Sequence, residues 1–122
     1  TITQPKPTSW ALLDQLEVLM PGYQESAREV YEKYHRYETN HSLSKEDKTQ
    51  KMQEWWHHAL GVFAQFGMKE QYFNAISIKD VMLREGTPEA FDFFQDHAIP
   101  VLILSAGVHQ TIEMILSHHE FV

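Results

Sequence analysis

The sequence of 122 residues predicts an α/β chain in which a long helical region leads into one buried strand. Three observations predict this class. Apolar side chains recur at helical spacing along most of the chain as far as His97. The run Ile99–Leu104 is apolar and rich in β-branched residues, which is typical of a strand buried on both faces. Helical spacing then resumes after the small-residue turn Ser105–Gly107.

The first helices are expected over residues 9–20 and 23–38. Residues 1–8 contain two prolines, so we expect a connector there and not a regular element. Pro21 and Gly22 end the first helix. Its apolar side chains are Trp10, Leu13, Leu16 and Leu19.

The longest helix is expected to begin after Ser44 and to end at Gly67. Ser44 followed by Asp47 resembles a capping box, in which a serine side chain accepts a hydrogen bond from the first turn. The apolar stripe of this helix consists of Met52, Trp55, Trp56, Ala59, Phe63 and Phe66.

The remaining helices are expected to be shorter. Helical spacing indicates a helix over residues 69–76 and a further helical turn over residues 77–83. Thr87 as N-cap with Pro88 in the first turn predicts a helix that ends near His97. The last helix is expected over residues 108–117.

Composition and charge exclude several functional classes. The chain carries 10 Lys and Arg against 17 Asp and Glu, a net charge of −7, which repels the phosphate backbone of a nucleic-acid polymer. Its longest apolar run is too short to span a membrane. The absence of cysteine excludes a disulfide scaffold and a thiolate metal site. The sequence begins at Thr1 without features of a signal peptide, and we expect both ends to be cut from a longer chain.

The strongest chemical signal is the turn of Ser105, Ala106 and Gly107 after the expected strand. Ligands of open α/β sheets bind beyond the carboxyl ends of the strands. A serine hydroxyl beside the backbone N–H groups of a following helix suits a phosphate or another oxyanion. The alternative is an ordinary turn in which Ser105 caps the helix, and the local pattern leaves both interpretations open.

Two further side chains have alternative interpretations. Trp56, beside Trp55, is able to stack on a nucleobase, although a tryptophan in a helical apolar stripe is by default part of the core. Glu38 ends an aromatic-rich helix and is either an acceptor for a base edge or sugar, or a surface carboxylate.

The histidines do not form a metal-binding pattern. Zinc-binding helices usually place two histidines four residues apart, whereas the adjacent pairs His57-His58 and His118-His119 point in different directions on a helix. We therefore expect His57 and His58 on the polar flank of the long helix, and no metal site in this chain. A histidine-based metal protein stays a third, less favoured hypothesis.

The segments DVMLREG (Asp80–Gly86) and IPVLILSAG (Ile99–Gly107) resemble the cytosolic pyrimidine 5′-nucleotidases of the haloacid-dehalogenase-like phosphatases. The resemblance extends to residues 31–56 and 7–14 and so covers nearly the whole chain. It implies a Rossmann-like core with an inserted helical cap, of whose core only one strand and its flanking helices are present here. Residues 1–6 would hold the end of the first motif, 7–84 the cap and 85–122 part of the core.

The resemblance implies hydrolysis of pyrimidine nucleoside 5′-monophosphates to nucleoside and phosphate through an aspartyl-phosphate. Ser105, Ala106 and Gly107 would bind the phosphate, Glu38 would contact the base, and Trp56 would stack on it. Trp10 matches another base-contacting position. Ala59 stands where relatives can carry a serine that helps to read the base, so the pyrimidine preference does not follow.

The same resemblance implies Mg²⁺, a nucleophilic aspartate, an acid/base aspartate and a lysine, all expected outside these 122 residues. Because the reaction needs them together, we expect the chain alone to be inactive. The alternative function is a non-catalytic helical module that binds a nucleotide or a protein. The expected partner is a nucleoside monophosphate in the cytoplasm, with neither nucleic-acid polymer nor membrane, and the apolar run 101–104 predicts self-association.

Overall fold

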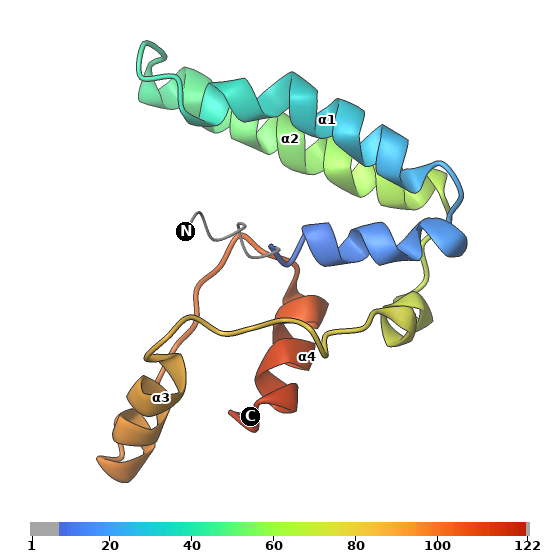
Figure 1. The fold of residues 1–122 in the computed structure, drawn as a ribbon. Helices are drawn as coiled ribbons and strands as arrows, with labels where there is room; N and C mark the ends of the chain where they lie inside the picture. Colours follow the sequence, from blue (N-terminus) through green and yellow to red (C-terminus); the bar gives the residue numbers. More distant parts are fainter. Residues whose placement is uncertain (1–7, 122) are drawn as a thin grey trace, which may run out of the picture. The chain divides into compact units, whose positions relative to one another are not determined.

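The computed structural model describes residues 8–121, which form two compact units. We call Asp14–Ala75 the hairpin unit, and residues 8–13 together with 76–121 the terminal unit. The described chain is helical (Figure 1). Its elements are η1 (Ala11–Val18), α1 (Tyr23–Glu38), α2 (Lys45–Gln65), η2 (Glu70–Ala75), α3 (Thr87–Asp96) and α4 (His109–His118), of which η1 and η2 are 3₁₀ helices.

In the hairpin unit, α1 and α2 lie side by side and antiparallel (Figure 1). Tyr34 is at the centre of their interface, with only 2% of its surface exposed. Its ring stacks on Trp55 at a centroid distance of 6.3 Å, and its hydroxyl lies 2.8 Å from Nδ1 of His58. Nearer the other end of the pair, Tyr23 stacks on Phe63 at 5.9 Å. The aromatic stripes of both helices therefore form a shared core.

Both ends of α2 are closed as the sequence predicts. The Ser44 hydroxyl accepts a hydrogen bond from the backbone N–H of Asp47 at 3.1 Å, which confirms the N-cap. At the other end, Gly67 adopts a φ of 63°. The N–H of Met68 then bonds the carbonyl of Phe63 at 3.0 Å, which closes the last helical turn.

The start of α1 is capped by the side chain of Glu17, which precedes the helix. Its N-cap, Gly22, has a φ of 92° and offers no side chain of its own. The Glu17 carboxylate instead accepts hydrogen bonds from the N–H groups of Gly22 at 2.7 Å and Gln24 at 2.8 Å. These backbone hydrogen bonds lower the pKa of Glu17 below its ordinary value, and the bond from Gln24 contributes most.

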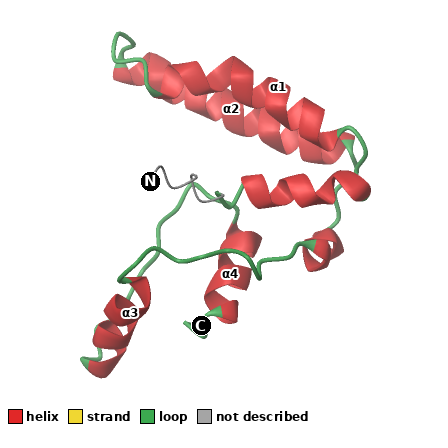
Figure 2. Cartoon of the chain, viewed as in Figure 1, coloured by secondary structure: helices red, strands yellow, loops and turns green. Residues whose placement is uncertain are grey.

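The prediction of a strand over Ile99–Leu104 is wrong. Residues 8–121 contain helices, turns and extended loop but no strand (Figure 2). The run is extended and exposed, with 81% of the Leu102 surface and 85% of the Leu104 surface accessible. A strand requires a hydrogen-bonded neighbour, and no second extended segment of the described chain pairs with this one. The predicted Rossmann-like core is therefore not seen.

Two smaller predictions also need correction. Residues 77–83 are not helical but contain a turn, in which the N–H of Val81 bonds the carbonyl of Ile78 at 2.9 Å. The N-cap of α3 is Gly86, with a φ of 84°, and Thr87 is already helical. The domain boundaries at 6/7 and 84/85 stay predictions.

The terminal unit contains an open apolar groove of about 380 Å³. Its walls come from α3, α4 and alternate side chains of the extended run. Two of its lining residues, Phe91 and Phe121, stack on each other with ring centroids 4.3 Å apart. The other lining residues are Phe94, Gln95, Ile99, Val101, Ile103, Leu116 and Glu120.

Candidate functional site

The turn Ser105–Gly107 leads directly into α4. Ser105 is exposed, and its hydroxyl accepts a hydrogen bond from the backbone N–H of Gly107 at 3.0 Å. The first N–H groups of any α-helix have no acceptor within the helix and carry a partial positive charge. The exposed Ser105 hydroxyl thus lies next to a helix N-terminus that favours an anion. The same hydroxyl also stabilises the turn through its bond with the Gly107 N–H.

Ser9, almost a hundred positions earlier in the chain, holds the other side of this turn. Its hydroxyl accepts a hydrogen bond from the backbone N–H of Val108, the N-cap of α4, at 3.1 Å. The hydroxyl of Thr111 lies 3.3 Å from the Ser9 carbonyl and 2.9 Å from the Val108 carbonyl, to which it donates. Thr111 is fully buried, so its bond to the Val108 carbonyl is shielded from water.

Trp10 adds a contact on the opposite side of the glycine. Its indole N–H donates to the carbonyl of Ala106 at 3.1 Å. Gly107 has no room for a side chain, because a Cβ there would collide with the Ser9 hydroxyl and come within 2.9 Å of Ile112 Cδ1. The structure therefore brings Trp10 together with Ser105, Ala106 and Gly107.

Sequence reasoning missed the part played by Ser9 and Thr111. The residues around Ser9 predict only the start of a helix. A contact between residues 99 positions apart produces no periodic pattern in the sequence. The available signal was Gly107 itself, since a glycine in a turn indicates either a positive φ or a close approach of other atoms. The structure shows the close approach.

Glu38 and Trp56 lie in the hairpin unit. Glu38 is the last residue of α1 and is exposed, while Trp56 is on α2 with 42% of its surface exposed. Lys51 lies over the Tyr37 ring at 5.2 Å, so the end of α1 faces α2 about five residues before Trp56. Five residues span about 7.5 Å along a helix. The two predicted base contacts therefore lie on the same helix pair, Glu38 at the end of α1 and Trp56 part-way along α2.

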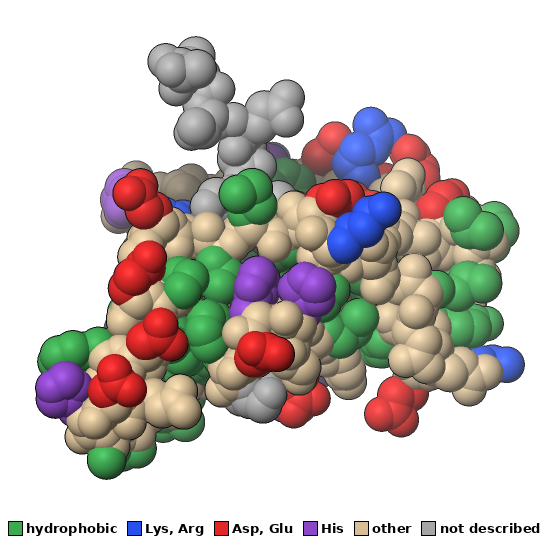
Figure 3. Space-filling view, turned by 60° about the horizontal axis from the view of Figure 1, so that its bottom comes forward, with side chains coloured by type: hydrophobic (Ala, Val, Ile, Leu, Met, Phe, Trp, Pro, Cys, Tyr) green, Lys and Arg blue, Asp and Glu red, His purple; other side chains and the backbone are tan. Residues whose placement is uncertain are grey.

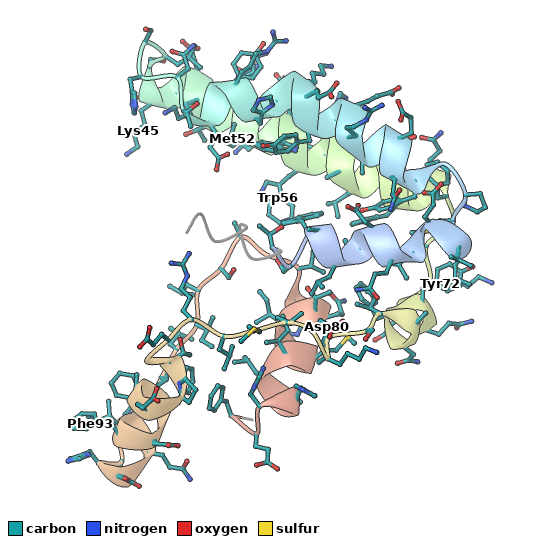
Figure 4. All side chains as sticks on the ribbon, viewed as in Figure 1. Lys45, Met52, Trp56, Tyr72, Asp80 and Phe93 are labelled. Atoms are coloured by element: carbon teal, nitrogen blue, oxygen red, sulfur yellow. The ribbon has the colours of Figure 1, made fainter. Side chains whose placement is uncertain are left out.

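Figure 4 shows Met52 and Trp56 along the same edge of α2, as their four-residue spacing requires. Trp56 is thus only partly used in the core, since Trp55 and not Trp56 stacks on the buried Tyr34. The exposed 42% of its surface is accessible to a planar ligand.

The described residues form no cluster of three or more His, Cys, Asp or Glu side chains able to hold a metal ion. His58 is engaged with Tyr34, and His57 is exposed. These residues therefore do not by themselves fit a Mg²⁺ site. No helix of residues 8–121 is long and apolar enough to cross a membrane.

The charge around the turn differs from that of the chain as a whole. Acidic side chains are common on the face shown in Figure 3, in keeping with the net charge of −7. Residues 97–112, however, include no Asp, Glu, Lys or Arg. On α4, His109 lies 3.4 Å from Glu113, and both are exposed. No carboxylate adjoins Ser105 in sequence to repel an anion.

These features define a helical protein with two elements of interest. One is a helix hairpin with an aromatic core, and the other is a turn at a helix N-terminus that suits an anion. The chain belongs to the pyrimidine 5′-nucleotidase (UMPH-1) family, which matches residues 3–122. The family predicted from the two sequence motifs is thereby confirmed.

Curated relatives from several animals are similar to the chain over 111 residues. A "7-methylguanosine phosphate-specific 5′-nucleotidase" from Gallus gallus is 31% identical, and the match covers 90% of this chain and 38% of the relative. Proteins of the same description are 27% identical in Mus musculus, where 37% of the relative is covered, and 26% in Drosophila melanogaster, where 35% is covered. The chain therefore spans less than two fifths of the length of these relatives.

Proposed function

We propose that this chain is part of a longer protein that hydrolyses nucleoside 5′-monophosphates to nucleoside and phosphate. The observation that carries the proposal is the family match over residues 3–122. The geometry supports it, since an exposed Ser105 hydroxyl at the start of α4 suits a phosphate oxygen.

The proposal gives each predicted site residue its own role. Ser105, Ala106 and Gly107 bind the phosphate through the serine hydroxyl and backbone N–H groups, and the phosphate replaces the Ser105 hydroxyl as acceptor for the Gly107 N–H. Trp56 stacks on the base through its accessible face, and Glu38 accepts hydrogen bonds from the base edge.

The base preferred by this protein is a separate part of the proposal. The relatives' description favours 7-methylguanosine 5′-monophosphate, and the family description favours a pyrimidine. A 7-methylated guanine carries a positive charge, which the face of an indole ring attracts. An accessible indole at Trp56 and a carboxylate at Glu38 would therefore favour the methylated purine over an uncharged pyrimidine.

The attacking carboxylate and Mg²⁺ are proposed to come from parts of the longer protein outside these residues. Residues 8–121 contain no cluster of side chains that would hold the metal ion. Bound Mg²⁺ would offset negative charge on the phosphate during its transfer. We accordingly propose that the 122 residues alone are inactive.

The test measures phosphate release by the full-length protein from 7-methylguanosine, cytidine and uridine 5′-monophosphates, with Mg²⁺ and with EDTA. We expect Mg²⁺-dependent release, fastest with the methylated purine. Faster release from the pyrimidines would reverse the base preference. Binding of all three nucleotides without phosphate release would replace catalysis with the alternative function, a nucleotide-binding module.

A further inference from the structure

We infer that Ser9 and Trp10 are positioning residues that hold the phosphate-binding turn, and that Trp10 is not a base contact. This inference rests on the proposed function, because it takes Ser105–Gly107 as the phosphate-binding turn. It concerns residues that neither the family match nor the relatives' descriptions assign.

The contacts of Ser9 and Trp10 fix the backbone on both sides of Gly107. Trp10 holds the carbonyl of Ala106 before the glycine, at 3.1 Å. Ser9 holds the N–H of Val108 after it, also at 3.1 Å. Two consecutive side chains therefore restrain a glycine-containing segment that would otherwise be the most flexible part of the turn.

The fit between Ser9 and Gly107 is steric as well as polar. The Ser9 hydroxyl occupies the position that a Cβ on Gly107 would need. The glycine is therefore required by the approach of Ser9, and not by a left-handed backbone, since its φ is not among the positive ones. Such a close approach makes the two positions interdependent.

Thr111 connects this clamp to α4. Its buried hydroxyl lies within hydrogen-bond distance of the carbonyls of Ser9 and Val108. Ser9 thus touches α4 through its hydroxyl and through its carbonyl. The clamp leaves Ser105 exposed, so the substrate-facing side of the turn stays accessible.

Trp10 has a defined task in this arrangement. Its ring is half-buried and its N–H is directed to the Ala106 carbonyl. A tryptophan that reads a base would affect only substrates that carry a base. A tryptophan that positions the phosphate-binding turn affects every phosphate ester.

The first experiment compares kcat/KM of the full-length protein for 7-methylguanosine 5′-monophosphate and for ribose 5-phosphate, which has no base. We expect Ser9→Ala and Trp10→Phe each to lower kcat/KM by up to about tenfold for both substrates, the effect of one lost hydrogen bond. Trp56→Ala should lower it for the nucleotide alone, and Ser117→Ala, an exposed hydroxyl on α4, should change neither. A loss confined to the nucleotide in Trp10→Phe would overturn the inference.

The second experiment does not depend on activity. Hydrogen–deuterium exchange of the full-length protein should show faster exchange in the peptide containing Val108 in Ser9→Ala than in wild type or Ser117→Ala. Equal protection in all three would remove Ser9 from the clamp. If the protein hydrolyses no phosphate ester but shows this difference, the proposed function fails while the clamp stands.

A double substitution tests the steric fit. Gly107→Ala alone should lower the thermal unfolding temperature, because the new Cβ meets the Ser9 hydroxyl. The same substitution in a Ser9→Ala background should lower it less, since the colliding oxygen is gone. Equal losses in both backgrounds would contradict the interdependence of the two positions.

Discussion

The two units of this chain differ in where their packing partners come from. In the hairpin unit, α1 and α2 are consecutive in sequence, and Tyr34 between them is only 2% exposed. In the terminal unit, the apolar run Ile99–Leu104 follows α3 but packs poorly, with Leu104 85% exposed beside an open groove. The apolar run of the terminal unit thus stays exposed, whereas aromatic side chains of the hairpin unit form a closed core.

Local sequence signals suffice to predict packing where the packing partner is a neighbour in the sequence. A helix and the next antiparallel helix need only a short connection to bury their stripes. An extended segment needs a partner with matching backbone groups, and residues 8–121 supply none. The terminal unit is organised instead by the contacts of Ser9 and Trp10 with the turn before α4.

The largest effect that would sharpen this comparison is expected at Tyr34. Truncation by Tyr34→Ala should cost about 3–5 kcal/mol of unfolding free energy, because it empties the centre of the hairpin. Leu102→Ala, at an exposed position, should stay within about 0.5 kcal/mol. Urea unfolding followed by circular dichroism measures both, and equal losses would erase the distinction between the units.

A second prediction concerns the exposed run itself. Exposed, uncharged extended segments tend to pair with other chains, so the 122-residue chain should self-associate as its concentration rises. Leu102→Lys combined with Leu104→Lys should shift the sedimentation coefficient toward that of a monomer. Unchanged association in the double variant would assign it to another surface.

The sequence alone predicts some parts of this fold and not others. The ends of α2 were predictable because Ser44 and Gly67 act within one turn of their own positions. The apolar pattern of Ile99–Leu104 predicted a buried strand, and this was wrong because no extended segment of residues 8–121 pairs with the run. The contact of Ser9 with Val108 could not be predicted because the two residues are 99 positions apart in the sequence.

The candidate site was predictable to the same extent. Ser105–Gly107 and Trp10 carry motif-level signals, and the structure brings them together. Thr111 lies in an ordinary helical sequence, and only its burial against Ser9 indicates its part. The assignment of Glu38 and Trp56 to the base stays a prediction.

A smaller effect is expected at the N-cap of α2. Ser44→Ala removes the acceptor for the Asp47 N–H and should cost about 1 kcal/mol. Ser42→Ala, in the same exposed loop, should cost less than about 0.5 kcal/mol. The difference in urea midpoint between the two variants measures the cap, and equal midpoints would show that α2 does not need it.

The smallest effect is a pH dependence at Glu17. Its pKa is lowered in the folded state by hydrogen bonds from Gln24 and Gly22, so ionised Glu17 stabilises the fold. This contribution is present above the unfolded pKa of about 4.3 and is lost as pH falls through the lower folded pKa. The gap in urea midpoint between wild type and Glu17→Gln should close in that acid range. A gap that widens there would reverse the sign.

The central claim is that the Ser105 turn binds the phosphate of a nucleoside monophosphate. Its most direct test is phosphate release from 7-methylguanosine 5′-monophosphate by the full-length protein and by its Ser105→Ala variant. We expect a fall in kcat of about a hundredfold, the usual effect of removing one donor from a developing oxyanion, with the unfolding temperature nearly unchanged. Equal turnover by the two proteins would contradict it and would make Ser105 only the residue that shapes its own turn.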